Sequence, residues 1–148
     1  MALEDLYREI ILDHAKNPRN FAVLDNIPDS LAHENPSCGD TLKLEVMLEG
    51  ESVARIRVQM RGCAISTASA SIMSELASGR TVQEARGLAE AFISAMRSGG
   101  KDETTSAVES PIDAIDELAA FKGVMRFPVR VKCATLAWHA LLTVLPRR

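Results

Sequence analysis

The sequence contains few aromatic residues, few cysteines and no excess of either charge. It has one Trp, one Tyr and four Phe among 148 residues, whereas 47% of the chain is hydrophobic. Lys and Arg total 17 against 20 Asp and Glu, which leaves a net charge of −3. That charge provides no strong positive field, so we expect neither a nucleic-acid partner nor an anionic membrane surface. The low aromatic content predicts an aliphatic core with closely packed helices.

Signals for secretion and for membrane insertion are also missing. Glu4, Asp5 and Arg8 interrupt the N-terminal stretch, where a signal peptide would need an apolar region. No segment approaches the roughly 18 consecutive apolar residues of a membrane-spanning helix. Three cysteines are too few, and odd in number, for a disulfide framework, which favours a reducing compartment. We therefore expect a cytoplasmic protein with no membrane association.

A single domain is expected to cover residues 1–148. A chain of this length buries roughly 68–70% of its unfolded surface and needs no metal merely to stay folded. Alternating apolar residues at 41–48 and 54–61, on either side of Glu49-Gly50-Glu51, predict an antiparallel hairpin with one polar face. A short strand is also expected just before Pro36. No internal repeat or linker divides the chain.

Helical periodicity surrounds this hairpin. Apolar spacing and end signals predict helices at residues 3–16, 64–79, 88–98, 111–121 and 133–145. Thr81 to Glu84 forms a capping-box pattern that opens a further short helix, and residues 101–109 are predicted to be loop. Strands followed by helices indicate the α+β class, here a small antiparallel sheet covered on one face by several helices.

The three cysteines all fall at predicted element boundaries. Cys38 precedes the first hairpin strand, Cys63 lies where the second strand meets a helix, and Cys133 stands where the last helix begins. Helix N-termini carry unpaired N–H groups and positive potential, which stabilise a thiolate. Asp40, two residues after Cys38, adds a carboxylate. Three thiolates and one carboxylate make a tetrahedral zinc set and would equally suit an iron–sulfur cluster.

A plainer interpretation is that these cysteines are buried and act as small apolar residues, as free cysteines often do. All three interrupt the apolar periodicity instead of continuing it, which weakens that interpretation. The spacing contains no Cys-x-x-Cys pair, so spacing alone does not identify a metal site. Residue types and spacing therefore leave both a metal or cluster site and three buried structural cysteines open.

Four motifs resemble those of the IscU/NifU-N family and occur in the family's order. The three cysteine motifs are Asn35-Pro36-Ser37-Cys38-Gly39-Asp40, Gly62-Cys63-Ala64-Ile65-Ser66 and Val131-Lys132-Cys133-Ala134-Thr135-Leu136-Ala137-Trp138. The N-terminal motif is Asp13-His14-Ala15-Lys16-Asn17-Pro18-Arg19-Asn20. The likeness extends from the first predicted helix to the last, and it implies the family's α+β fold.

Within this family the sequence is most similar to the SufU type. IscU-type members have a histidine directly before the third cysteine, where this chain has Lys132, and a Leu-Pro-Pro-Val-Lys segment upstream, which it lacks. Extra length around residues 99–122 also matches SufU. The resemblance implies one zinc per chain, with the ligands Cys38, Asp40, Cys63 and Cys133. It further implies that Cys38 accepts sulfur and that Arg130 contacts a desulfurase.

The implied function is sulfur transfer for iron–sulfur cluster assembly. A SufS-type cysteine desulfurase, which uses pyridoxal phosphate, would donate persulfide sulfur, and downstream iron–sulfur assembly proteins would receive it. The chain would then be an accessory protein that stimulates its desulfurase, not a free-standing enzyme. Because IscU-type relatives favour the third cysteine, Cys133 is the other candidate for the sulfur carrier.

Two other functions can be built on the same residues. An IscU-like scaffold would assemble an iron–sulfur cluster on these ligands. A zinc hydrolase or deaminase fits less well, because no His-x-Glu or Pro-Cys-x-x-Cys pattern accompanies Asp40. The histidines are not expected to be ligands: His14 is predicted to pack in the core, whereas His33 and His139 are predicted to lie at the surface.

Overall fold

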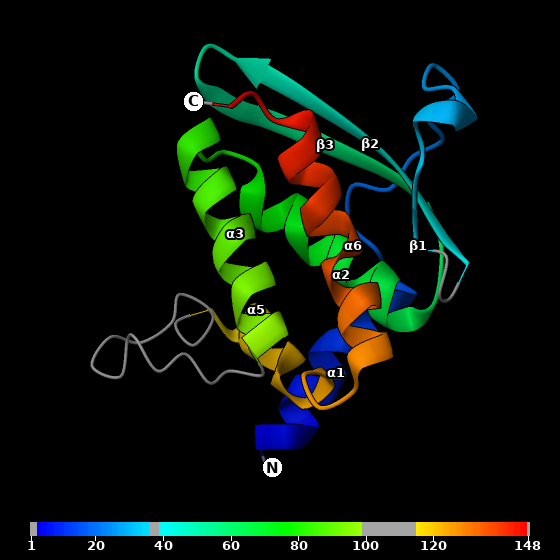
Figure 1. Cartoon of the computed structure of the whole chain (residues 1–148), viewed down its shortest axis with the longest axis vertical. Helices are drawn as coiled ribbons and strands as arrows, with labels where there is room; N and C mark the ends of the chain where they lie inside the picture. The colour runs from blue at the N-terminus through cyan, green and yellow to red at the C-terminus, as the bar shows by residue number, and fades with distance from the viewer. Residues whose placement is uncertain (1–2, 36–38, 99–114, 148) are drawn as a thin grey trace.

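The computed structural model describes residues 3–35, 39–98 and 115–147. Figure 1 shows a sheet along one side of the molecule, with the helices gathered on its other side. The predicted α+β class and the covering of the sheet on one face are therefore confirmed. Among the described residues, no helix is long and apolar enough to span a bilayer.

The sheet is antiparallel and has the strand order β1-β2-β3. The three strands are β1 (His33–Asn35), β2 (Asp40–Glu49) and β3 (Ser52–Arg61). Gly50, in the turn between β2 and β3, has a φ of +65°, a conformation that glycine adopts without steric cost. The predicted hairpin and the short strand before Pro36 are both present.

The inward face of the hairpin follows the predicted alternation with one interruption. Its buried apolar residues are Leu42, Leu44, Val53, Ile56 and Val58. The pairing of β2 with β3 shifts register between Met47 and Leu48. Val53 is consequently buried and Ala54 exposed, so the predicted inward position of Ala54 is wrong. A slip of one residue moves each side chain to the opposite face of the strand.

The helical elements of the described chain are α1 (Leu3–Lys16), α2 (Ala64–Ala77), α3 (Val82–Ser98), α5 (Asp116–Ala119) and α6 (Pro128–Val144), with the 3-10 helices η1 (Asp29–Leu31) and η3 (Ala120–Val124). The capping box before α3 forms as predicted. The Glu84 N–H donates to Thr81 Oγ1 at 3.1 Å, and the Thr81 N–H donates to Glu84 Oε1 at 3.2 Å.

Two helix predictions need correction at the boundaries of α3 and α6. α3 is continuous where a short helix and a second helix were predicted, because its apolar face keeps a helical period across Gly87. α6 begins at Pro128, since proline fits the first position of a helix. Cys133 therefore lies inside α6, and the predicted helix N-terminal effect on its thiolate is wrong.

A third correction concerns the helix predicted at 111–121. The described part of that region contains the short α5 followed by the 3-10 helix η3, which continues to Val124. Residues 99–114, which include the predicted loop at 101–109, lie outside the described residues.

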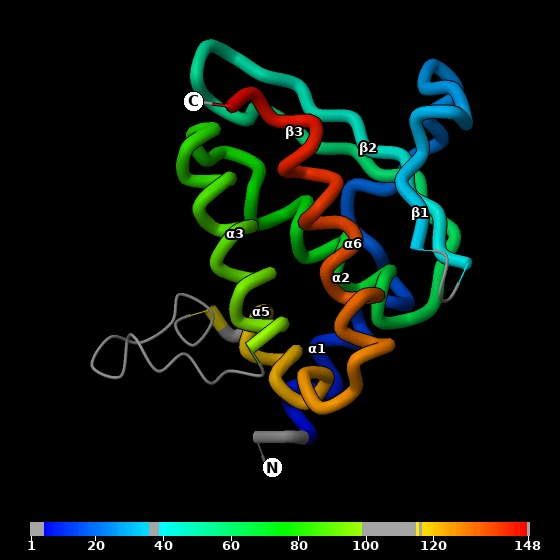
Figure 2. Tube along the Cα trace, in the orientation of Figure 1, coloured from blue at the N-terminus to red at the C-terminus, as the bar shows by residue number. Residues whose placement is uncertain are grey.

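An aromatic cluster joins α6, α3 and η3 at the centre of the core. The Trp138 ring stacks on Phe92 with a centroid separation of 4.9 Å, and Phe121 meets Phe92 edge-on at 5.7 Å. Trp138 is fully buried, which confirms its predicted packing role. α6 packs against both α2 and α3, and Figure 2 shows its trace passing in front of α2 with α3 beside it.

Buried serines on α2 connect this helix to its neighbours. The Ser69 hydroxyl accepts a hydrogen bond from Trp138 Nε1 at 3.0 Å and donates to the Ala134 carbonyl at 2.5 Å. Ala134 directly follows Cys133, so this pair of bonds fixes the part of α6 that carries the third cysteine. Every buried polar side-chain atom in the described chain has a hydrogen-bond partner, as stable packing requires.

His14 connects α1 to α2. Its ring is 5% exposed; Nδ1 lies 2.8 Å from Ser71 Oγ, and Nε2 lies 3.8 Å from a Glu75 carboxylate oxygen. The predicted packed histidine is confirmed. Burial lowers the pKa of His14, and the Arg19 charge acts in the same direction against the smaller opposing effects of Glu75 and Asp13.

We expect the free energy of unfolding to fall as the pH drops below about 6.5, the ordinary pKa of histidine. Folding lowers the pKa of His14, so the unfolded chain binds more protons in this range and acid favours unfolding. Urea unfolding between pH 5 and 8 measures this dependence, which His14→Gln should flatten. Burial and the Arg97 charge lower the pKa of His139 too, but its position is exposed, so His139→Gln should remove a smaller part of the dependence than His14→Gln. Equal pH dependence of the unfolding free energy in wild type and His14→Gln would show that His14 is not the cause of this dependence.

Candidate metal centre

Asp40 occupies the first position of β2 and points to the core side of the sheet. It continues the inward alternation of Leu42 and Leu44, and only 2% of it is exposed. The pairing of β2 with β3 places Thr41 opposite Arg61. The residues that follow Arg61 therefore lie beside Asp40, where a buried carboxylate needs hydrogen-bond donors or a cation.

Cys63 follows β3, caps the N-terminus of α2 and lies against Asp40. Its N–H donates to Asp40 Oδ1 at 3.0 Å, and its Sγ is 3.9 Å from Oδ2. The Ser66 N–H donates to Cys63 Sγ at 3.5 Å, the bond that a capping side chain makes with the first helical turn. The predicted position at the junction of strand and helix is confirmed, and Cys63 is exposed.

Cys133 reaches the same place from α6 and is buried, with 4% exposed. Asn35, at the end of β1, directs its side-chain amide at Cys133 Sγ over 3.9 Å. Asn35 is also the strand partner of Asp40. The third cysteine is therefore placed by helix packing against the sheet and not by its own neighbours in sequence.

The donor atoms of Asp40, Cys63 and Cys133 all lie within 4.8 Å of one another. A tetrahedral zinc ion, with Zn–S bonds near 2.3 Å and Zn–O bonds near 2.0–2.2 Å, holds its donors about 3.6–3.8 Å apart. Inward shifts of about 1 Å or less would bring the three donors to that spacing. Two thiolates and a carboxylate are also ligand types that zinc accepts, so the residues present fit this metal.

Gly62 provides the space that the Asp40 carboxylate occupies. A Cβ at this position would lie 2.8 Å from Asp40 Oδ1 and 3.0 Å from Asp40 Cγ. Contacts that short would displace the carboxylate from the N–H of Cys63. Glycine is therefore required beside Cys63 because of a close approach across the hairpin.

Ser66 contacts two of the three candidate ligands. Its hydroxyl donates to Asp40 Oδ2 and lies 3.2 Å from Cys63 Sγ. The side chain is fully buried, so water does not compete for these contacts. Ser66 was not among the residues predicted for the site. The available signal was its position three residues after the helix-capping Cys63, which is the spacing of a capping box.

The other residues predicted for the site are placed as follows. Cys38 lies in 36–38, outside the described residues, between Asn35 and Gly39, which are joined by a backbone hydrogen bond of 2.9 Å. Arg130 is exposed in the first turn of α6, inside the helix that was predicted to begin after it, and its guanidinium lies 5.1 Å from the Phe127 ring centroid. His33 is half-buried on β1, where burial lowers its pKa.

Ser66→Ala is expected to weaken binding of Zn²⁺ or Co²⁺ by about 10- to 100-fold, the usual effect of losing a group that orients a metal ligand. Competition with a chromophoric chelator at fixed pH measures this affinity. Ser78→Ala is the matched control, because it removes a hydroxyl at the far end of α2 that donates to the Ser74 carbonyl. Equal affinities in Ser66→Ala and wild type would mean that Asp40 keeps its position without this hydroxyl.

Comparison with known proteins gives consistent matches over nearly the whole chain. The model of the NifU-like N terminal domain family matches residues 6–134. The chain is 40% identical over 141 residues to the zinc-dependent sulfurtransferase SufU of Bacillus subtilis, covering 94% of this chain and 88% of the relative. It is 34% identical over 146 residues to the iron–sulfur cluster assembly scaffold protein IscU of Streptococcus pyogenes, covering 98% and 86%.

A solved structure agrees with these sequence matches. The crystal structure of a candidate iron–sulfur cluster assembly scaffold protein for the SUF system, from Fervidobacterium islandicum, aligns with a TM-score of 0.73 at 29% identity. The alignment covers 93% of this chain and 95% of that one. The family predicted from the cysteine motifs is confirmed by sequence and by fold. The chain belongs to the NifU-like N-terminal domain family, in which it is similar to both SufU and IscU proteins.

Proposed function

We propose that this chain is a zinc-binding sulfur acceptor of iron–sulfur cluster assembly, which takes persulfide sulfur from a SufS-type cysteine desulfurase. The observation that carries the proposal is the convergence of Asp40, Cys63 and Cys133 within 4.8 Å. Cys38, two residues before Asp40 in sequence, completes the proposed ligand set. Identity of 40% to a protein named as a zinc-dependent sulfurtransferase supports the same function.

Zinc is favoured over a resident cluster by the residue directly before Cys133. Position 132, where the IscU-type histidine would stand, is an exposed lysine, whose protonated amine is not a metal ligand. The proposed set is therefore three thiolates and one carboxylate, which suits four-coordinate zinc. When bound, zinc would hold these thiolates deprotonated without redox chemistry of its own.

The proposed transfer is a thiol–disulfide exchange with Cys38 as the nucleophile. The Cys38 thiolate attacks the outer sulfur of the donor's cysteine persulfide, forming one S–S bond while the donor's S–S bond breaks. The donor cysteine leaves as a thiolate, and Cys38 then carries the persulfide, so no external oxidant or reductant is consumed. A thiolate bound to a cation is a poor nucleophile, so docking of the donor must first free Cys38.

Arg130 is proposed to contact the desulfurase. It is exposed in the first turn of α6, three residues before Cys133, and its position over the Phe127 ring restricts the guanidinium. A guanidinium offers two parallel N–H donors to a carboxylate, a geometry that a lysine amine does not reproduce. A partner carboxylate held there would lie at the rim of the candidate metal centre.

Protein purified without added metal is expected to contain one zinc per chain by elemental analysis. Removing it with a chelator should leave the far-UV circular dichroism largely unchanged, because the aromatic and aliphatic core is separate from the site. Stoichiometric iron with sulfide absorption and negligible zinc would instead favour the IscU-like scaffold. Collapse of the fold on chelation would show that the core alone does not maintain it.

Cys38→Ala is expected to retain part of the zinc but to lose persulfide uptake from the desulfurase. Cys63→Ala should mainly lose the metal, because it removes the thiolate of a residue that is fixed between β3 and α2. Mass spectrometry of the alkylated protein detects the trapped persulfide, and elemental analysis gives the zinc content. Normal uptake by Cys38→Ala would move the acceptor assignment to Cys133.

A further inference from the structure

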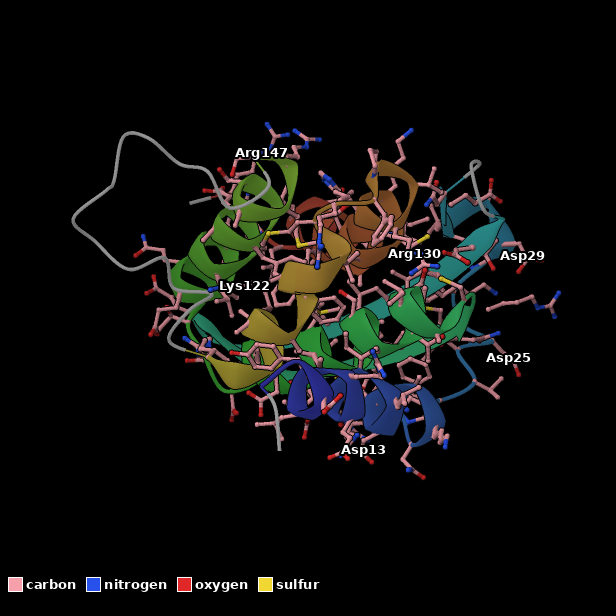
Figure 3. The ribbon with its side chains drawn as sticks, turned by 90° about the horizontal axis from the view of Figure 1, so that it is seen from below. Asp13, Asp25, Asp29, Lys122, Arg130 and Arg147 are labelled. Atoms are coloured by element: carbon pink, nitrogen blue, oxygen red, sulfur yellow. The ribbon has the colours of Figure 1, made fainter. Side chains whose placement is uncertain are left out.

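A groove of about 560 Å³ lies between α1, the start of α2, η3 and the start of α6. Its floor is apolar: Ile11 and Ile65 are partly buried against the core, and Ala120 and Val124 are buried. Leu12, 43% exposed, lies at its edge. Figure 3 looks onto this end of the molecule and labels Lys122 and Arg130.

The rim of the groove is basic. Its charged residues are Arg8, Lys122, Arg126 and Arg130, all exposed, and no Asp or Glu is among the described residues that line it. The ion pairs of the described chain are His14–Glu75, Arg19–Asp13, Lys43–Asp29 and Arg57–Glu45. None of them includes an arginine of the rim. In a chain with a net charge of −3, the three arginines of the rim are a local concentration of positive charge.

A second groove shows that this charge is not a general property of the surface. It has a similar volume, about 570 Å³, and lies on another side of α6. Glu34 lines it together with Arg97 and Lys132, so its rim has charges of both signs. Of these two grooves, the one beside α1 combines an apolar floor with a rim of one sign.

The basic groove is lined by residues that stand close in sequence to two of the candidate ligands. Ala64 and Ile65, which line the groove, directly follow Cys63, whose side chain is exposed. Arg130 lines it from α6, three residues before Cys133. A protein segment lying in the groove would therefore place its own neighbouring residues next to the ligands.

We propose that this groove binds an acidic, partly apolar segment of the protein that donates sulfur, a proposal that rests on the function proposed above. Apolar side chains of that segment would cover the floor, and its Asp and Glu residues would meet the arginines of the rim. Opposite charges across an interface raise the association rate and exclude wrongly charged partners. A second copy packed symmetrically, groove to groove, is a poor occupant, because the two basic rims would repel each other.

The test compares two pairs of charge reversals. Arg8→Glu with Arg126→Glu changes the rim and leaves the proposed metal ligands and Arg130 in place. Arg55→Glu with Arg147→Glu is the matched control, because it makes the same change in net charge at exposed positions outside the groove. The probe is the cysteine desulfurase of the same organism, with its affinity measured by titration calorimetry at two salt concentrations.

The rim variant is expected to bind the desulfurase at least about 10-fold more weakly than wild type at low salt, with a smaller dependence on salt. Zinc content and circular dichroism should stay unchanged, and the control should bind within about 2-fold of wild type. Equal affinity of the rim variant and wild type would overturn the groove proposal and leave the sulfur-acceptor function standing. An equal loss in both variants would also overturn it, because net charge alone would then explain binding.

Two further outcomes separate this proposal from the function on which it rests. Wild-type protein that neither binds the desulfurase nor takes up its sulfur would remove the proposed function, and the groove proposal with it. Concentration-dependent dimerisation of the wild type that the rim variant abolishes, seen by sedimentation, would assign the groove to a second copy and overturn the choice of occupant.

Discussion

The buried carboxylate of Asp40 is the constraint on which the site depends. A charge with 2% exposure is stable inside a protein only when hydrogen bonds or a cation compensate for lost water. Here the Cys63 N–H and the Ser66 hydroxyl each contact one oxygen, and Gly62 leaves the room that these contacts need. All three neighbours come from residues 62–66, which the register of β2 with β3 brings beside Asp40.

Cys133 depends on a separate set of contacts. It stands on α6, whose position follows from the Trp138–Phe92 stack and from the two bonds of Ser69 to Trp138 and Ala134. The third candidate ligand is therefore held by the core, while the first two are held by the hairpin and the helix cap.

The chain is similar both to a protein named as a zinc-dependent sulfurtransferase and to a protein named as a cluster assembly scaffold. Fold and donor set do not distinguish the two activities, since the ligands suit zinc and iron–sulfur clusters alike. Differences in activity between the two kinds of protein must therefore arise from residues next to the ligands, such as the lysine at position 132, and from the surfaces that meet partners. The basic groove is a surface of this kind, and it lies next to the ligands, because Ala64, the residue after Cys63, lines it.

The features that arise from local periodicity and motif order could be predicted before the structure was known. These are the hairpin, α1, α2, the capping box, the family and the candidate ligands, since each is encoded by neighbouring residues. Tertiary structure decided the rest. A register shift exchanged Val53 for Ala54 on the inward face, α6 began before Cys133, and Ser66 and Gly62 gained their roles from Asp40, which lies 26 and 22 residues away along the chain. Side chains so distant in sequence meet only when the hairpin register and the packing of α6 are fixed, and neither is readable from a local pattern.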